Sequence, residues 1–473
     1  MRKILMALAV MVVAIAVSAP HFASAASTKV SGFWRFRGIT QDNDDRDDTV
    51  NDGRQNSDAL IRPRWTFKSL KGKIVALYEL DFDSSGFQFA TDGKNGTKQS
   101  STGRASVGTN RYILDFAVPG TKLRFRVGKT DWISPDKEII ASSGQNRVGG
   151  WGLRGKLSKS LKFELWNSQT TDGNASASDD NDYLASLTWT SPGLKISPYV
   201  VWEKYNGETA GTTAITSDTT ERDIWFYGVT ADAKFGKVKL TLTGVMEDGT
   251  LDFGRGVNAT GRADTDIQGY IVLIRSWLDL GRGLKVGFYG HFTPGDDDIT
   301  SATGDLGTQP DGKLTRFVPP KNGGSCRLKG PQLFTRRRYN SVASGLAAES
   351  QCLNGDGGAK LNGAQVYELL FKYKAAKNIT ISGNYSLIRS AAARSNIDAN
   401  GDGDALDAGD STFSDSKNVG NEFDIAVRWD IYKGLRTIIS YAHLFAGDYG
   451  KSTTATRDFD DTWMLVWELT HAF

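Results

Sequence analysis

The sequence predicts an all-β fold, a closed antiparallel barrel of about eighteen strands, with sixteen as the alternative count. Apolar residues recur with a period of two along most of the chain, and short turns alternate with long polar loops between the apolar runs. A period of two is the pattern of a strand with one apolar face, and helical spacing does not fit it. Gly (52), Phe (23), Tyr (15) and Trp (12) are abundant, as expected for many strands joined by tight turns.

The first 25 residues have the layout of a secretory signal peptide. A positive start with Arg2 and Lys3 is followed by an apolar run over 4–17 and by a small-x-small site that ends at Ala25. Cleavage is expected after Ala25. A membrane anchor is the alternative, but the apolar run is shorter than the roughly 20 residues that a spanning helix needs. Because no linker or shift in composition divides residues 26–473, we expect one barrel domain there.

Each predicted strand has one apolar and one polar face. In the first strand, Trp34 and Phe36 alternate with Arg35 and Arg37. The same alternation predicts the other strands near residues 61–68, 74–83, 111–118, 122–127, 151–157, 160–168, 182–190, 194–204, 223–234, 237–247, 266–276, 284–292, 364–375, 378–388, 421–431, 435–445 and 460–473.

The final strand indicates what the apolar face contacts. Trp463, Leu465, Trp467, Leu469, His471 and Phe473 share one face and end with the chain. A strand that faces lipid and carries aromatic residues near its interfaces has this pattern. An edge strand of a soluble sandwich is the alternative for this stretch alone.

The connections between the strands fall into two classes. Tight turns are expected at 69–72, 118–121, 158–160, 191–193, 235–236, 279–283, 375–377 and 432–434. Long polar loops are expected at 40–58, 84–108, 130–147, 169–181, 205–222, 248–265, 293–363, 389–420 and 446–459, of which 293–363 is a long external loop. Short periplasmic turns and long extracellular loops are the layout of a transmembrane barrel. Closure pairs every backbone polar group, as hydrocarbon requires, so we expect the outer membrane of a Gram-negative bacterium.

Several stretches resemble bacterial outer-membrane porins, most closely those of sulfate- and metal-reducing bacteria, some of which are homotrimers. They are 31–37 (Ser-Gly-Phe-Trp-Arg-Phe-Arg), 62–64 (Arg-Pro-Arg) with 69–72, 111–115 with 118–121, and 467–473. The terminal Phe473 resembles the closing Phe that acts as an insertion signal in such barrels. The resemblance implies passive diffusion of small hydrophilic solutes and ions through a homotrimer, surrounded by outer-membrane lipid and lipopolysaccharide.

Other functions have weaker support. Without Arg2 and Lys3, 55 basic residues stand against 54 acidic ones, and this balance argues against nucleic acid as a partner. Only His291, His443 and His471 remain after the signal peptide, none in a catalytic motif, so we predict that the chain is not an enzyme. A barrel sheath for an electron-transfer cytochrome is an alternative, although the sequence has no Cys-x-x-Cys-His motif for a haem of its own. A substrate-specific channel or exporter for an oligosaccharide or organic acid is the closer alternative.

Two further predictions concern the loops. Cys326 and Cys352 lie in one exported loop and are predicted to form a disulfide. Asp398, Asn400, Asp402 and Asp404 give the D-x-N-x-D opening of a calcium loop. The twelfth position is Gly409 instead of Glu, so a flexible acidic loop is an equal alternative to a Ca²⁺ site, and no other cofactor is expected.

The 130–147 loop is predicted to fold into the barrel, as the third loop does in porins. It contains Trp132, Ile133, Ile139 and Ile140 where an external loop, the alternative, would be polar. Its acidic candidates at a constriction are Asp131, Asp136 and Glu138. The alternation places an arginine-rich wall opposite them, made of Arg35, Arg37, Arg62, Arg64, Arg111, Arg124, Arg126 and Arg154. Opposed charges across a narrow aqueous gap orient solutes and filter ions. Because Glu79, Asp81 and Asp83 offset part of the wall, only a mild anion preference is expected.

Overall fold

The structure is a computed structural model that describes residues 27–42, 54–83, 106–138, 141–142, 148–172, 179–205, 221–252, 265–296, 313–315, 317–318, 363–392, 415–449 and 461–473. The predicted signal peptide, the predicted Cys326–Cys352 disulfide and the predicted calcium loop at 398–404 lie outside these residues.

Within the described residues, eighteen long strands form a closed antiparallel barrel, which confirms the predicted fold class and the strand count. Each strand pairs with its neighbours in the chain, and the alternation of short turns and long connections follows the predicted pattern. The strands are β1 (Ser27–Asp42), β2 (Arg54–Ser69), β3 (Ile74–Asp83), β4 (Ser106–Ala117), β5 (Leu123–Lys129), β8 (Gly149–Lys156), β9 (Leu161–Asp172), β10 (Asp179–Ser191), β11 (Leu194–Tyr205), β12 (Glu221–Phe235), β13 (Val238–Asp252), β15 (Tyr270–Gly281), β16 (Leu284–Thr293), β18 (Ala364–Ala376), β19 (Ile379–Arg389), β20 (Asn418–Tyr432), β21 (Leu435–Ala446) and β22 (Thr462–Ala472).

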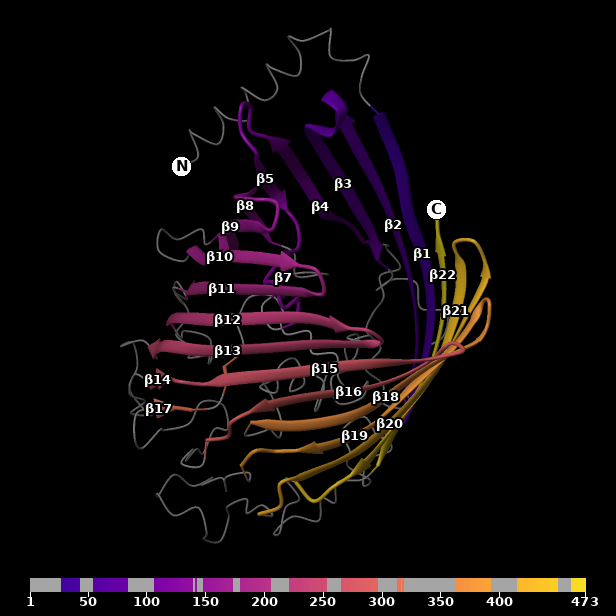
Figure 1. The fold of residues 1–473 in the computed structure, drawn as a ribbon. Coiled ribbons are helices and arrows are strands. Elements are labelled where there is room, and N and C mark those ends of the chain that lie inside the picture. The colour runs from indigo at the N-terminus through magenta and orange to yellow at the C-terminus, as the bar shows by residue number, and fades with distance from the viewer. Residues whose placement is uncertain are drawn as a thin grey trace, which may run out of the picture.

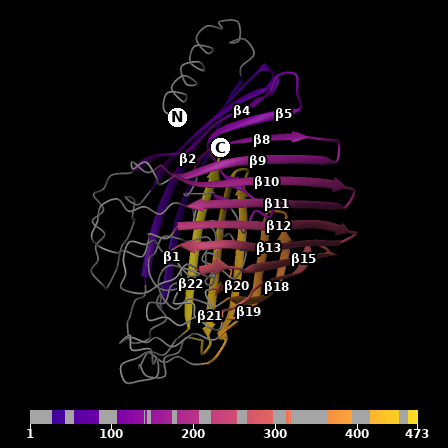
Figure 2. The same ribbon diagram turned by 90° about the vertical axis from the view of Figure 1, so that its left-hand side faces the viewer.

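The first and last strands close the barrel. Figure 1 shows β1 in indigo beside β22 in yellow, and Figure 2 shows the strands from a second side. The register runs from Phe33 opposite Ala472 to Asp42 opposite Trp463. Beyond it, the Gly32 N–H donates to the Phe473 carbonyl at 2.9 Å, and the Phe473 N–H donates to the Gly32 carbonyl at 3.0 Å. The last residue of the chain therefore completes the seam.

Smaller elements lie between the barrel strands. A short 3₁₀ turn, η2 (Leu70–Gly72), joins β2 to β3. Within the 130–147 loop, β6 (Trp132–Ile133) pairs with β7 (Ala141–Ser142) as a separate two-stranded sheet. β14 (Thr265–Ile267) extends the barrel sheet and pairs in parallel with β17 (Lys313–Leu314). In the part of the chain that the structure describes, no helix is long and apolar enough to cross a membrane.

The outer face of the barrel is apolar, as the alternation predicts. On β12, Trp225, Tyr227 and Val229 are exposed and alternate with the buried Ile224 and Phe226. On β22, Leu465 and Trp467 are exposed while Met464 and Val466 are buried. The exposed large apolar side chains continue around the barrel, so they form the belt that faces lipid.

Part of the inner face is also apolar. Buried aliphatic and aromatic side chains from many strands form one cluster. Its part on β12 to β19, here named the apolar wall, includes Ile224, Phe226, Val245, Ile271, Val366 and Ile388.

Residues 313–315, 317 and 318, here named the docked segment, pack against the apolar wall. Phe317 meets the edge of Phe226 at a ring-centroid distance of 6.2 Å. The Val318 N–H donates to Glu247 Oε1 at 2.6 Å, and the Gln268 N–H donates to the Leu314 carbonyl at 3.0 Å. These residues belong to the 293–363 loop. The prediction that the loop as a whole is external stays a prediction, because most of the loop lies outside the described residues.

Candidate functional site: the charged lining of the barrel

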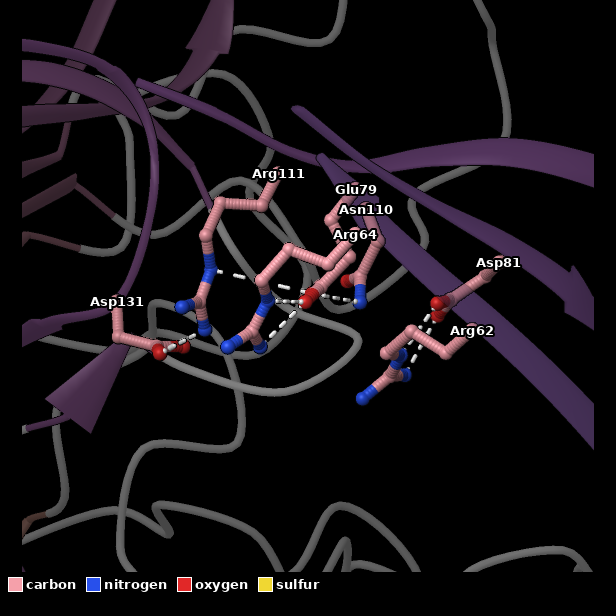
Figure 3. Close-up of polar contacts among 7 residues, drawn as sticks. All are labelled: Arg62, Arg64, Glu79, Asp81, Asn110, Arg111 and Asp131. Carbon is pink, nitrogen blue, oxygen red and sulfur yellow. Dashed lines mark hydrogen bonds and ion pairs between the residues drawn. The ribbon is translucent and has the colours of Figure 1, made fainter. Parts of the chain in front are cut away.

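Three inward-facing arginines, Arg62, Arg64 and Arg111, form the upper arginine group (Figure 3). They lie farther from the short-turn end of the barrel than the second group described below. Two nitrogens of Arg62 bind the two oxygens of Asp81, one of them at 2.6 Å. Arg64 Nε donates to Glu79 Oε2 at 2.5 Å. Arg111 pairs with Asp131, and its Nε lies 4.0 Å from Glu79 Oε1. Three cations therefore meet the three carboxylates of Asp81, Glu79 and Asp131, and the group is close to neutral.

A β-bulge in β4 arranges this group. The register between β3 and β4 shifts after Glu79, which pairs with Arg111, so that Leu80 pairs with Thr109 and Asn110 is the extra residue. A bulge sets two residues of one strand opposite one residue of its partner. Both neighbours can therefore reach the same carboxylate, and Asn110 Nδ2 donates to Glu79 Oε1 at 2.8 Å. Glu79 is fully buried, which holds it as the common acceptor of the group.

Three more arginines, nearer the short-turn end, form the lower arginine group. Arg124 and Arg154 each place a nitrogen 2.6 Å from Asp115, and Arg126 lies at 3.1 Å. Arg124 and Arg154 are also direct cross-strand partners. Like charges in that position repel each other, so the shared carboxylate is what makes the arrangement stable. Glu164, the cross-strand partner of Arg154, adds one more negative charge. Positive charge is still in excess.

The two arginines of β1 lie on the same face as these groups. Arg35 pairs with Leu60 of β2, and Arg37 pairs with Glu468 of β22. Leu60 shares its face with Arg62 and Arg64, because they are spaced two apart along β2. All eight arginines of the predicted wall thus lie on one continuous inner face, here named the arginine wall, from β1 to β8.

The described part of the 130–147 loop, residues 130–138, reaches from β5 to strands far along the barrel. Tyr199 of β11 donates its hydroxyl to Asp136 at 2.5 Å, and Ser134 donates to the same carboxylate. Arg275 of β15 binds Glu138 through two bonds of 2.6 and 2.9 Å. Tyr199 and Arg275 are on the same face of their strands as the buried, inward-facing side chains. The segment therefore lies inside the barrel.

The near end of the segment is held by an aromatic contact. Trp132 is 2% exposed and lies 5.8 Å from the ring of Trp166. Its indole also rests on Gly150 and Gly152 of β8, where an added Cβ would meet it at 2.9 and 3.0 Å. The two glycines therefore leave the space that the indole fills.

The arrangement separates anchoring charges from available ones. The three acidic residues of the segment are bound to residues of the barrel strands: Asp131 to Arg111, Asp136 to Tyr199 and Glu138 to Arg275. Asp136 and Glu138 are also buried. The side chains of Arg154, Arg124 and Arg126 keep 39, 32 and 26% of their surface exposed. Since a guanidinium has five N–H donors, the lower group can still donate to a passing anion. Whether these residues line a constriction stays a prediction.

Sequence reasoning missed several residues of this lining. Tyr199, Arg275 and Asn110 were not singled out, and neither was Asp115 as the shared acceptor. The parity of the strands places Asp115, Tyr199 and Arg275 on the inner face, but no local signal identifies their partners. Glu138 and Arg275 are 137 residues apart, so only the closed barrel brings them together.

The closed eighteen-strand barrel with its outer apolar belt has the fold of bacterial outer-membrane porins, and it places the chain in the outer membrane of a Gram-negative bacterium. Among solved structures, OccK8 (OprE) of Pseudomonas aeruginosa superposes with a TM-score of 0.52 at 13% identity, over 94% of this chain and 98% of that one. OpdO of the same organism gives 0.51 at 11% identity, over 96 and 99%. OccAB2 of Acinetobacter baumannii gives 0.50 at 11% identity, over 94 and 98%. At such identities the likeness shows the fold.

Comparison by sequence gives one partial match. Residues 360–461 match the model of a family described as Alginate export. No curated protein matches the chain by sequence.

Proposed function

We propose that the protein is a water-filled channel for the passive diffusion of small hydrophilic solutes and ions, with a mild preference for anions. The observation that carries the proposal is the arginine wall, in which the lower group has more positive than negative charge and keeps its side chains partly exposed. A fixed excess of one sign inside an aqueous passage raises the local concentration of the opposite ion. The absence of an enzymatic step is part of the proposal, and the predicted homotrimer stays a prediction that blue native electrophoresis tests.

Planar-bilayer recording tests the proposal. The purified protein should form open channels, and the reversal potential under a KCl gradient should report a modest preference for Cl⁻. Replacing Arg62, Arg64, Arg124 and Arg126 together by Ser should shift the selectivity toward K⁺. A barrel that gives no current would overturn the proposed channel, whereas unchanged potentials would show that these side chains do not face the permeating ions.

A second candidate is a substrate-specific channel or exporter for an oligosaccharide or organic acid. The match of residues 360–461 to the Alginate export family favours it, since alginate is a polymer of sugar carboxylates and arginine binds carboxylates through paired bonds. Current blockade separates the two candidates. Short oligouronates should block a specific channel at concentrations where neutral oligosaccharides of equal length do not, whereas a general porin should respond to both according to size.

A further inference from the structure

The short-turn end of the barrel repeatedly places a cation beside an exposed apolar residue. The turns are tight: Gly236 and Gly434 have φ of +58° and +87°, which side chains other than glycine rarely adopt. The residues that precede these two glycines are exposed. Exposed cations follow exposed apolar residues in the pairs Leu157 and Lys159, Phe235 and Lys237, and Tyr432 and Lys433.

One of these turns opens onto a groove in the outer wall. The groove crosses the seam, has a volume of about 360 Å³ and is lined on its apolar side by Trp34, Phe36, Leu435 and Leu469. Trp34 and Leu435 are both cross-strand partners of His471. The three adjacent strands β1, β22 and β21 therefore form the floor of the groove. These side chains belong to the lipid-facing belt.

The lysine of the groove stands at its periplasmic mouth. Lys433 and Tyr432 stand there on the turn between β20 and β21, His471 of β22 also lines the groove, and no Asp or Glu of the described residues does. Lys433 forms no ion pair with a described residue, whereas acidic residues near this end pair with other cations, as Asp430 does with Arg428 at 2.8 Å. Lys433 at the mouth can therefore bind an anion from outside the protein.

We propose that this groove binds an anionic phospholipid of the periplasmic leaflet, with an acyl chain along Trp34, Phe36 and Leu469 and the phosphate at Lys433. An apolar channel along the strands with a cation at one end matches a molecule that has a hydrocarbon tail and an anionic head. A water-borne anion would gain nothing from the apolar lining. Tyr432, 74% exposed, lies at the level where amphipathic aromatic rings favour the boundary between headgroups and hydrocarbon.

Native mass spectrometry of the detergent-solubilised barrel tests this site. Titration with phosphatidylglycerol and with phosphatidylethanolamine should show tighter binding of the anionic lipid. Lys433→Gln should weaken the binding of phosphatidylglycerol about fivefold, as expected for the loss of one cation at a membrane surface. It should weaken the binding of phosphatidylethanolamine less, because the ammonium of that lipid offsets its phosphate. Lys433→Arg should retain the preference.

A matched control comes from the opposite end of the barrel. Lys204 lies 5.9 Å from the ring of Trp202 near the extracellular end of β11, so Lys204→Gln makes the same change of charge away from the groove and should leave the affinities unchanged. Equal binding of the two lipids by the unmodified protein would overturn the proposal, and so would an equal loss in the two Gln variants. Binding of soluble muropeptides that depends on Lys433, without a preference for the anionic lipid, would overturn it in favour of a cell-wall contact. Unchanged heat-dependent gel mobility confirms that each variant keeps its barrel.

Discussion

Two inner surfaces of the same barrel differ in what covers them. The arginine wall of β1 to β8 carries ion-paired cations whose side chains stay partly exposed in the lower group, whereas the apolar wall of β12 to β19 carries side chains such as Ile224 and Val366 with no exposed surface. Both obey the same period of two. The period decides which residues face inward, and it does not decide whether they then meet water or another part of the chain.

This difference predicts where the aqueous path runs. The docked segment fills the space beside the apolar wall, and its polar groups are bound, as the Val318 N–H is by Glu247. Buried donors that are satisfied in this way are costly to expose. We infer that solutes pass beside the arginine wall, bounded on the other side by residues 130–138.

The largest expected effect comes from removing the contact between the docked segment and the apolar wall. Phe317→Ala removes a ring that is 1% exposed and packs on Phe226, at an expected cost of about 3–5 kcal/mol in unfolding free energy. The docked segment should then detach and the single-channel conductance should rise. Urea unfolding of the refolded barrel and bilayer recording measure the two effects.

Phe235→Ala is the control for this change, because Phe235 is 66% exposed on the outside. It removes the same atoms without opening an internal cavity, so the conductance should stay the same. An unaltered conductance in Phe317→Ala, together with the expected loss of stability, would show that the docked segment does not border the aqueous path.

A second change tests the attachment of residues 130–138. Glu138→Gln leaves the partly buried Arg275 without its carboxylate, and since 18% of the Arg275 side chain is exposed, the expected cost lies at the lower end for broken buried pairs, about 3 kcal/mol. Adding Arg275→Met should restore part of the lost stability. The two single variants and the double variant together form a double-mutant cycle that isolates the interaction energy of the pair. The exposed pair of Lys285 and Asp279 provides the control: Lys285→Gln should leave stability unchanged. Equal losses in the single and double variants would mean that the pair does not hold the segment.

The barrel could be predicted from the sequence, because the alternation within each strand identifies its two faces and the residue types in each turn identify the turn. Trp34 and Trp467 were assigned to the lipid face from neighbours two residues away, and both are exposed. The apolar wall was harder to predict. Residues 224–229 read Ile-Trp-Phe-Tyr-Gly-Val, an apolar run without alternation, which is typical of a strand covered on both faces. That run was the available signal that some other segment packs inside.

The sequence predicted which residues of each strand face the inside, but it did not predict the contacts between strands. Parity places Arg124, Arg126 and Arg154 on the inner face, but three arginines on Asp115 follow only from the pairing of β4, β5 and β8. Asn110 reaches Glu79 because of a bulge, and one extra residue in a strand leaves no clear mark in an alternating pattern. Local patterns therefore describe faces, while contacts between distant strands depend on register and closure.

The smallest expected effect compares the two arginine groups. Asp115→Asn removes the one carboxylate that three arginines share, and Asp81→Asn removes the partner of Arg62 alone. Each variant adds one positive charge. Arg62 is 16% exposed and Arg154 is 39% exposed, so the charge gained in the lower group lies closer to the permeating ions. One positive charge roughly 8 Å away in water lowers the energy of Cl⁻ and raises that of K⁺ by about 0.5 kcal/mol each, so Asp115→Asn should raise the Cl⁻ to K⁺ permeability ratio about fivefold at low salt, and Asp81→Asn less. Reversal potentials at low salt measure both, and the difference should shrink as salt shortens the Debye length. Equal shifts in the two variants would place both groups at the same distance from the ion path and remove the distinction between them.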